Sequence, residues 1–155
     1  MGIAKSQSGG GGSSITKITA QVDNTATDTL ADVTGLSFVV EAGKTYRFEF
    51  VISYNSSSTA VGSRWTINGP AFTRLAYRSA YALLSTSQTV NSAASTYDFP
   101  VAANGTSGAT SGNIAVIKGI ITPSANGTVI ARFAREGASG TISAMPDSYV
   151  EYQEI

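Results

Sequence analysis

One alternating run, residues 43–54 (GKTYRFEFVISY), constrains the fold more than any other part of this sequence. Large side chains occupy every second position of the run: Tyr46, Phe48, Phe50, Ile52 and Tyr54. Because successive side chains of a strand point to opposite faces, the run places an aromatic wall on one face and puts Arg47 and Glu49 on the other. This is the pattern of a half-buried antiparallel strand, entered through a turn at residues 41–43. The run therefore predicts an all-β fold.

Strand signals continue along the chain, separated by turns rich in Gly, Pro and Asn. The expected strands cover residues 15–22, 29–34, 36–40, 44–54, 63–67, 97–102, 113–122, 128–135, 141–145 and 148–155. Residues 72–77 are ambiguous, and residues 80–84 have the composition to start a helical turn. The apolar run at 113–122 predicts a buried central strand, and PSANG at 123–127 predicts a hairpin that returns along residues 128–135. This succession predicts a single antiparallel jelly-roll-like β-sandwich.

The beginning of the chain has the composition of a flexible linker. Residues 5–14 read KSQSGGGGSS and contain no apolar side chain to bury. Two interpretations stay open: a disordered leader or cloning scar, or an arm that reaches a neighbouring subunit and becomes ordered there. At 155 residues the chain fits one domain with a substantial core. We therefore expect a flexible Gly/Ser-rich N-terminal arm at residues 1–14 and one β-sandwich domain at residues 15–155.

Composition narrows the classes of function. The chain contains no cysteine and no histidine, so it lacks a thiol nucleophile, the usual general base near neutral pH and the commonest transition-metal ligands. We expect a protein that is not an enzyme and needs no cofactor or metal. A formal net charge of +0 argues against a nucleic-acid partner, and no apolar run reaches the ~18 residues of a membrane span. Only 13% of residues are charged, and a surface of low charge favours association with other proteins.

Four segments together carry a resemblance to a known group of proteins. They read ADVTGLSFVVEAGKTYRFEF (31–50), RWTINGP (64–70), GIITPSANGTVIARFARE (119–136) and SYVEYQEI (148–155). This succession resembles the small jelly-roll structural proteins of tailed bacteriophages, which are similar in architecture to trimeric C1q/TNF-like β-sandwiches. The resemblance implies a non-enzymatic virion component that is assembled in the host cytoplasm and self-associates, most often as a trimer. It implies a capsid decoration or cement protein that binds the major capsid protein; the alternative is a tail fibre or baseplate module that binds a receptor or glycan.

Charged and aromatic residues provide the candidates for an interface. The middle of the chain is basic and its end is acidic, which indicates either scattered solvated charge or complementarity between neighbouring subunits. The basic residues are Arg64, Arg74 and Arg78, and the acidic ones are Asp147, Glu151 and Glu154. The single tryptophan is either buried core or an interface anchor, and the tyrosines carry the same ambiguity. The candidate interface residues are Lys5, Arg47, Trp65, Arg74, Tyr77, Arg78, Tyr81 and Tyr152.

Three aspartates near the first turns, Asp23, Asp28 and Asp32, offer oxygen atoms that could ligate calcium. Their spacing matches no EF-hand loop, and aspartate is a common turn residue, so we expect turn caps here. For the alternative function in a phage tail, a glycan or receptor would bind the loops at residues 55–63 and 85–95. The sequence offers no cleft of convergent acids.

Overall fold

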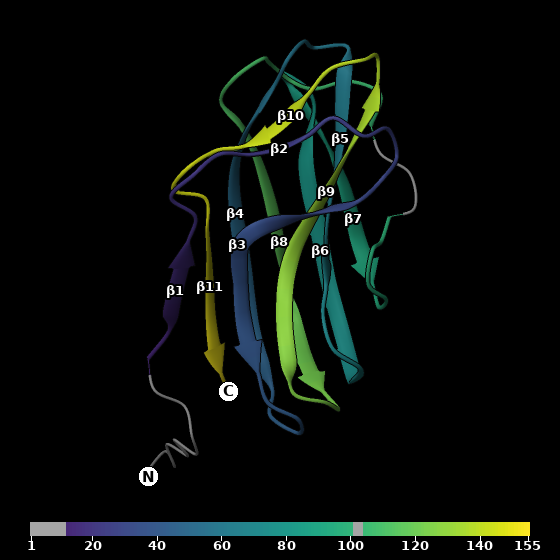
Figure 1. Cartoon of the computed structure of the whole chain (residues 1–155). Helices are drawn as coiled ribbons and strands as arrows, with labels where there is room; N and C mark the ends of the chain where they lie inside the picture. Colours follow the sequence, from purple (N-terminus) through teal and green to yellow (C-terminus); the bar gives the residue numbers. More distant parts are fainter. Residues whose placement is uncertain (1–11, 101–103) are drawn as a thin grey trace, which may run out of the picture.

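The computed structural model describes residues 12–100 and 104–155, and this part of the chain folds into strands without a helix. Figure 1 shows the strands arranged in two layers. The strands are β1 (Ser14–Lys17), β2 (Val22–Asn24), β3 (Ala31–Val40), β4 (Tyr46–Ser56), β5 (Val61–Asn68), β6 (Phe72–Leu84), β7 (Ser87–Ala94), β8 (Asn113–Pro123), β9 (Gly127–Gly137), β10 (Ile142–Ala144) and β11 (Tyr149–Glu154). The predicted all-β class is confirmed.

The strands form a large and a small sheet whose connections follow a jelly-roll pattern. The large sheet has the order β1-β11-β4-β8-β6-β7, with β10 joining β4 to β2, and the small sheet has the order β3-β9-β5. Antiparallel ladders join β1 to β11, β3 to β9 and β4 to β8, so early strands pair with late ones in a nested series. This nesting wraps the chain into a sandwich, as the sequence predicts.

The core lies between the two sheets and is built on the alternating run. The inward side chains of β4 are at most 6% exposed. They meet the small sheet through aromatic contacts: the ring of Phe38 lies 5.8 Å from that of Phe48 and 6.1 Å from that of Phe50. At the other end of the sandwich, Trp65 stacks on Phe133 with ring centroids 4.9 Å apart. The predicted aromatic wall is therefore the inner face of the large sheet.

Strand β6 corrects the interpretation of residues 72–84. The sequence left residues 72–77 ambiguous and suggested a helical turn at 80–84, but one strand covers both segments. It pairs with β8 through residues such as Leu75 and Ala80, and with β7 through residues such as Ala80 and Tyr81. A short apolar run does not distinguish a helix from a strand, and pairing on both sides decides the outcome here. Strand β7, whose sequence SQTVNSAA is mostly polar, was not predicted.

The turn at residues 123–127 is correct, but the predicted hairpin is wrong. Strand β8 belongs to the large sheet, whereas β9 pairs with β3 and β5 in the small sheet. The turn therefore carries the chain across the core from one layer to the other. Turn residues specify a reversal of direction, and they do not specify whether the two flanking strands share hydrogen bonds or face each other.

The predicted strand at residues 97–102 is also wrong over its described part, because Tyr97 and Asp98 form a turn and residues 101–103 lie outside the described residues. Asp98 and Asn104, on either side of these residues, instead lie along the free side of β5. The amide of Asp98 donates to the carbonyl of Ile67 at 3.0 Å, and the amide of Asn104 donates to that of Ser63 at 3.2 Å. An uncovered edge strand invites pairing with other chains, so these two hydrogen bonds protect β5.

Candidate protein interaction surface

One face of the large sheet is left uncovered by the described strands. In Figure 1 the small sheet lies in front of β4, β8 and β6 and covers the inner face of the large sheet. We call the opposite face, formed by the outward side chains of β1, β11, β4, β8, β6 and β7, the broad face. Its side chains are Ile15, Lys17, Arg47, Glu49, Val51, Ser53, Arg74, Ala76, Arg78, Ala80, Ala82, Leu84, Val90, Ile114, Val116, Lys118, Ile120, Tyr149, Glu151 and Gln153.

The pairing register aligns an apolar row across the broad face. Tyr149 is opposite Val51, which is opposite Val116; Val116 is opposite Ala80, and Ala80 is opposite Val90. Val90 is 46% exposed, and Ile114, next along β8, is 47% exposed. Directly opposite side chains on adjacent strands have Cβ atoms about 5 Å apart, so the row is continuous. The row is half-buried over most of its length and exposed at Val90, and a continuous apolar strip on an uncovered sheet face is typical of a surface that binds another protein.

A charged row runs beside the apolar row. Glu151 of β11 is opposite Glu49 of β4, which is opposite Lys118 of β8, and Lys118 is opposite Arg78 of β6. The row is therefore acidic on one half of the face and basic on the other. Only one cross-strand ion pair lies within it, between Lys118 Nζ and Glu49 Oε2 at 3.8 Å.

The three predicted arginines all lie on the broad face. Arg47 has partners within its own chain, because its Nη2 lies 3.2 Å from Glu151 Oε1 and its Nε donates to Gln153 Oε1 at 3.0 Å. Arg74 and Arg78 are exposed, and neither makes an ion pair or a side-chain hydrogen bond within residues 12–100 and 104–155. These two arginines are the charges on this face that most need an external partner.

The remaining candidates lie elsewhere. Trp65, Tyr77 and Tyr81 are at most 4% exposed, so the structure moves them from the predicted interface into the core, in agreement with the alternative interpretation of Trp65. They alternate inward on β5 and β6, facing the opposite sheet. Tyr152 stacks on Phe38 with ring centroids 4.7 Å apart and is partly buried. Lys5 lies outside the described residues.

The sequence analysis did not identify the outward residues of β7 and β8 as interface candidates. For β8, one residue in the sequence indicates which side chains face outward. Within the apolar run of β8, residues of odd number face the core, and the residues between them face outward. These outward residues are Ile114, Val116, Lys118 and Ile120. The single lysine in the run marks the outward face, because a lysine is almost never fully buried. Val90 lies in a strand whose existence the sequence did not reveal.

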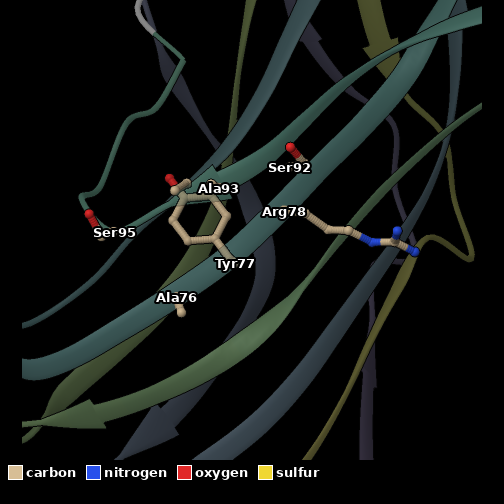
Figure 2. A pocket seen from close by; sticks show the side chains of 7 residues that line it. Ala76, Tyr77, Arg78, Ser92, Ala93 and Ser95 are labelled. Atoms are coloured by element: carbon tan, nitrogen blue, oxygen red, sulfur yellow. The ribbon is translucent and has the colours of Figure 1, made fainter.

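A shallow hollow of about 480 Å³ opens on the broad face where β7 carries a β-bulge. Figure 2 shows Ala76 and Tyr77 on one side of the hollow, with the Arg78 side chain pointing away from them. Small side chains from Ser92 to Ser95 form the opposite wall. Arg78 is the one charged side chain in this lining, so the hollow has no pair of groups suited to acid and base chemistry.

The hydroxyls of the buried tyrosines form hydrogen bonds with neighbouring strands and turns. The hydroxyl of Tyr77 donates to the carbonyl of Thr96 at 2.8 Å, and Asn91 Nδ2 donates to the hydroxyl of Tyr81 at 3.3 Å. Burial raises the pKa of Tyr77 above its ordinary value and raises the pKa of Tyr81 to about 12. Burial likewise raises the pKa of Tyr97 to about 12. These tyrosines therefore remain neutral in the folded protein at pH values where an unfolded tyrosine ionises.

We expect the stability to fall as the pH rises from 10 to 12. Over this interval the unfolded chain loses the Tyr81 proton and the folded chain retains it, so the folded state is progressively disfavoured. The stabilisation from Tyr81, roughly 2–3 kcal/mol, is complete below pH 10 and is lost as the pH approaches 12. Denaturant unfolding at several pH values should show a shallower decline for Tyr81→Phe, referenced to each protein at pH 8. Equal slopes for the two proteins would contradict this assignment.

The three aspartates near the first turns, where we expect turn caps, are not grouped as ligands of a metal ion. Asp32 Oδ1 forms an ion pair with Arg132, 3.0 Å from its Nε, and Arg132 Nη1 donates hydrogen bonds to the two carboxylate oxygens of Asp98 at 2.9 and 3.0 Å. This cluster ties β3 and the 97–100 turn to β9. No group of three or more His, Cys, Asp or Glu side chains within the described ranges is placed to hold a metal ion. No helix in the same ranges is long and apolar enough to cross a membrane.

Comparisons with known proteins give little additional information. No protein-family model matches the chain, and the comparison with curated proteins gives no match. Among solved structures, the chain is similar to the VP2 subviral particle of infectious bursal disease virus, with a TM-score of 0.24 and 10% sequence identity. The match covers 94% of this chain and 42% of the VP2 chain, so the chain spans less than half the length of that protein. The fold assignment therefore rests on the strand topology.

Proposed function

We propose that this protein is a non-enzymatic structural subunit of a virus particle, acting as a capsid decoration or cement protein. The broad face is the observation behind the proposal, because it presents a row of partly exposed apolar side chains and, on the same face, two arginines that have no ionic partner in the described chain. Enzymes and small-molecule binders concentrate convergent polar groups in a concave site. A flat, mixed apolar and charged face instead suits docking against another folded protein.

The position in a particle follows from the resemblance described for the sequence. On this proposal the subunit binds the major capsid protein and resides in the virion after assembly in the host cytoplasm. It also self-associates, and the resemblance implies a trimer. It needs no cofactor, nucleic acid or membrane. The N-terminal segment, residues 1–14, would reach a neighbouring subunit and connect capsomers.

The alternative is a receptor- or glycan-binding module of a tail fibre or baseplate. A shallow hollow of about 360 Å³ at the β6–β7 turn favours it, because hydroxyl and amide side chains line the hollow: Ser85, Thr86, Ser87 and Gln88. Such groups form hydrogen bonds with sugar hydroxyls. The hollow contains no aromatic ring, which a sugar would stack on, so this alternative ranks second.

Copy number per particle separates the two functions. Quantitative mass spectrometry of purified particles from the source that encodes this chain should find many copies relative to the major capsid protein. A few copies per particle would favour the tail module over the decoration protein. Absence of the protein from particles would contradict both placements.

A truncated protein tests the arm. Deleting residues 1–14 should weaken rebinding to particles stripped of the protein and should lower the temperature at which those particles release their contents. The double variant Arg74→Glu/Arg78→Glu, with the arm intact, tests the contribution of the broad face in the same assay. Undiminished binding of the truncated protein would contradict a role for the arm.

A further inference from the structure

The charged row of the broad face has an order that suits contact with a copy of itself. Reading across the sheet, Glu151 and Glu49 occupy β11 and β4, and Lys118 and Arg78 occupy β8 and β6. Two acidic positions are therefore followed by two basic positions at equal strand spacing. The boundary between the acidic and basic halves lies midway between β4 and β8, at the centre of these four strands.

A rotation of 180° about an axis parallel to the strands at this boundary exchanges the two halves. It places Glu49 of one copy against Lys118 of the other, and Glu151 against Arg78, twice in each pair of copies. An axis perpendicular to the strands would place each glutamate against its own equivalent, which is repulsive. Charge complementarity therefore selects one of the two arrangements. Stacked sheets pack with their strands about 30° apart, and these four strands lie close enough to the axis for the contacts to persist.

The apolar row is compatible with the same rotation. It places Val51 of one copy against Val116 of the other and Tyr149 against Ala80, so apolar side chains meet at the centre of the row. At the ends of the row it places Val90 against Lys17, whose Nζ lies 2.7 Å from Asp147 Oδ1 of its own chain. Six strands spaced ~4.8 Å apart and overlapping over ~20 Å give roughly 1,000 Å² of buried surface for the two copies together. This area is at the lower end of that found in specific complexes. A reversible dimer is therefore the expected outcome.

We propose that the broad face binds a second copy of this chain about a two-fold axis parallel to the strands between β4 and β8. The inference rests on the self-association in the proposed function, but it assigns the broad face to a second copy of this chain and leaves the contact with the capsid protein to other surfaces. It does not depend on the placement in a virion. It also explains why Arg78 has no ionic partner in the described part of one chain: its partner is Glu151 of the other copy. It replaces the three-fold arrangement that the resemblance implies with a two-fold one.

Two charge-reversed proteins test the proposal. Glu49→Lys/Glu151→Lys makes the charged row entirely basic, and Arg78→Glu/Lys118→Glu makes it entirely acidic. Sedimentation equilibrium at low salt should show a dimer for the unmodified protein and at least about tenfold weaker self-association for each variant alone. An equimolar mixture of the two variants should regain a dimer that contains one copy of each.

The mixture also tests the symmetry. Basic and acidic copies alternate in a pair, but they cannot alternate around a ring of three. An unmodified protein that sediments as a trimer, or a mixture that regains no dimer, would overturn the two-fold arrangement. An unmodified protein that stays monomeric at high micromolar concentration would overturn self-association through this face, and retained particle binding by that monomer would leave the proposed virion role standing.

A second pair of variants guards against misfolding, because Glu151 also contacts Arg47. Val116→Lys places a charge in the centre of the apolar row and should abolish the dimer. Val39→Lys is the matched control, because Val39 is 69% exposed on the small sheet, away from the broad face. Equal self-association of the two lysine variants would contradict the proposal. Circular dichroism on each variant establishes that the sandwich has folded.

Discussion

Replacing Trp65 with alanine should lower the free energy of unfolding by about 3–5 kcal/mol, the range for removing a buried tryptophan. The side chain is 0% exposed, and it lies between two other rings. Its ring centroid is 4.9 Å from that of Phe133 in the small sheet and 4.8 Å from that of Tyr54 in the large sheet. The substitution would therefore leave a cavity where the two layers meet and remove contacts in both.

Trp65→Phe is the matched control. It keeps an aromatic ring against Phe133 but loses the hydrogen bond that the indole Nε1 donates to Ser63 Oγ at 2.9 Å. We expect a loss of about 1–2 kcal/mol for this variant. Denaturant unfolding followed by circular dichroism measures both, since the only tryptophan is removed as a fluorescent reporter. A loss below about 1 kcal/mol for the alanine variant would show that the layers do not depend on this ring.

Replacing Gly119 with alanine should destabilise the sandwich by about 3 kcal/mol, at the upper end of the range for overpacking. Gly119 lies on the central strand β8, paired with both Phe48 and Tyr77. A Cβ atom at this position would lie 2.3 Å from the carbonyl oxygen of Ala76 and 2.5 Å from Tyr77 Cβ. Backbone atoms of β6 cannot move aside without breaking the β6–β8 ladder.

The same substitution should weaken self-association, because separating β6 from β8 moves Arg78 and Ala80 relative to Lys118 and Val116. Gly105→Ala is the matched control: a Cβ atom there meets nothing within 4 Å, and we expect a change near zero. Thermal unfolding of the two alanine variants gives the comparison. Equal stability of the two proteins would contradict the close approach of β6 to β8.

The alternating run shows what the sequence can predict. Strand β4 is flanked by strands on both sides and covered on one face, so burial follows the period of two in its sequence. For this reason the sequence could predict three features: the aromatic wall, the outward position of Arg47 and the terminal strand β11. The two strands expected at residues 29–34 and 36–40 are one irregular strand, β3: Gly35, between them, has a positive φ of 89° next to a register shift.

The rest of the fold depends on which strands pair, and that choice is made between distant segments. The turn at residues 123–127 predicts a reversal, but the partners of β9 lie in β3 and β5, outside that turn. The polar strand β7 is defined by its ladder with β6 and has no apolar alternation of its own. Strand propensity and hydrophobic pattern describe only neighbouring residues in the sequence. They do not specify which distant strands pair, and that pairing decides whether a segment forms a strand.

The broad face was only partly predictable for the same reason. Arg47, Arg74 and Arg78 were identified as interface candidates because each charge in a low-charge chain is conspicuous. The alignment of Arg78 with Lys118, Glu49 and Glu151 in the charged row requires the register of four strands that are far apart in the sequence. Trp65 was also among the interface candidates, but it is a core residue. The residue type alone fits both an interface anchor and a core residue, and only the packing of the two sheets distinguishes them.

Cross-linking between two single-cysteine proteins tests most directly whether the broad face joins two copies. The sequence contains no cysteine, so Tyr149→Cys and Ala80→Cys each provide one thiol on the broad face. Within one chain these positions lie on β11 and β6, three strand spacings or about 14 Å apart. The two-fold pairing brings Tyr149 of one copy against Ala80 of the other. A short bis-maleimide should therefore cross-link an equimolar mixture of the two proteins efficiently and each protein alone poorly.

Val39→Cys, on the small sheet, should give only background cross-linking in any mixture. The two-fold broad-face dimer predicts more cross-linked product between positions 149 and 80 than any of these controls gives. A mixture that cross-links no better than Val39→Cys would contradict it.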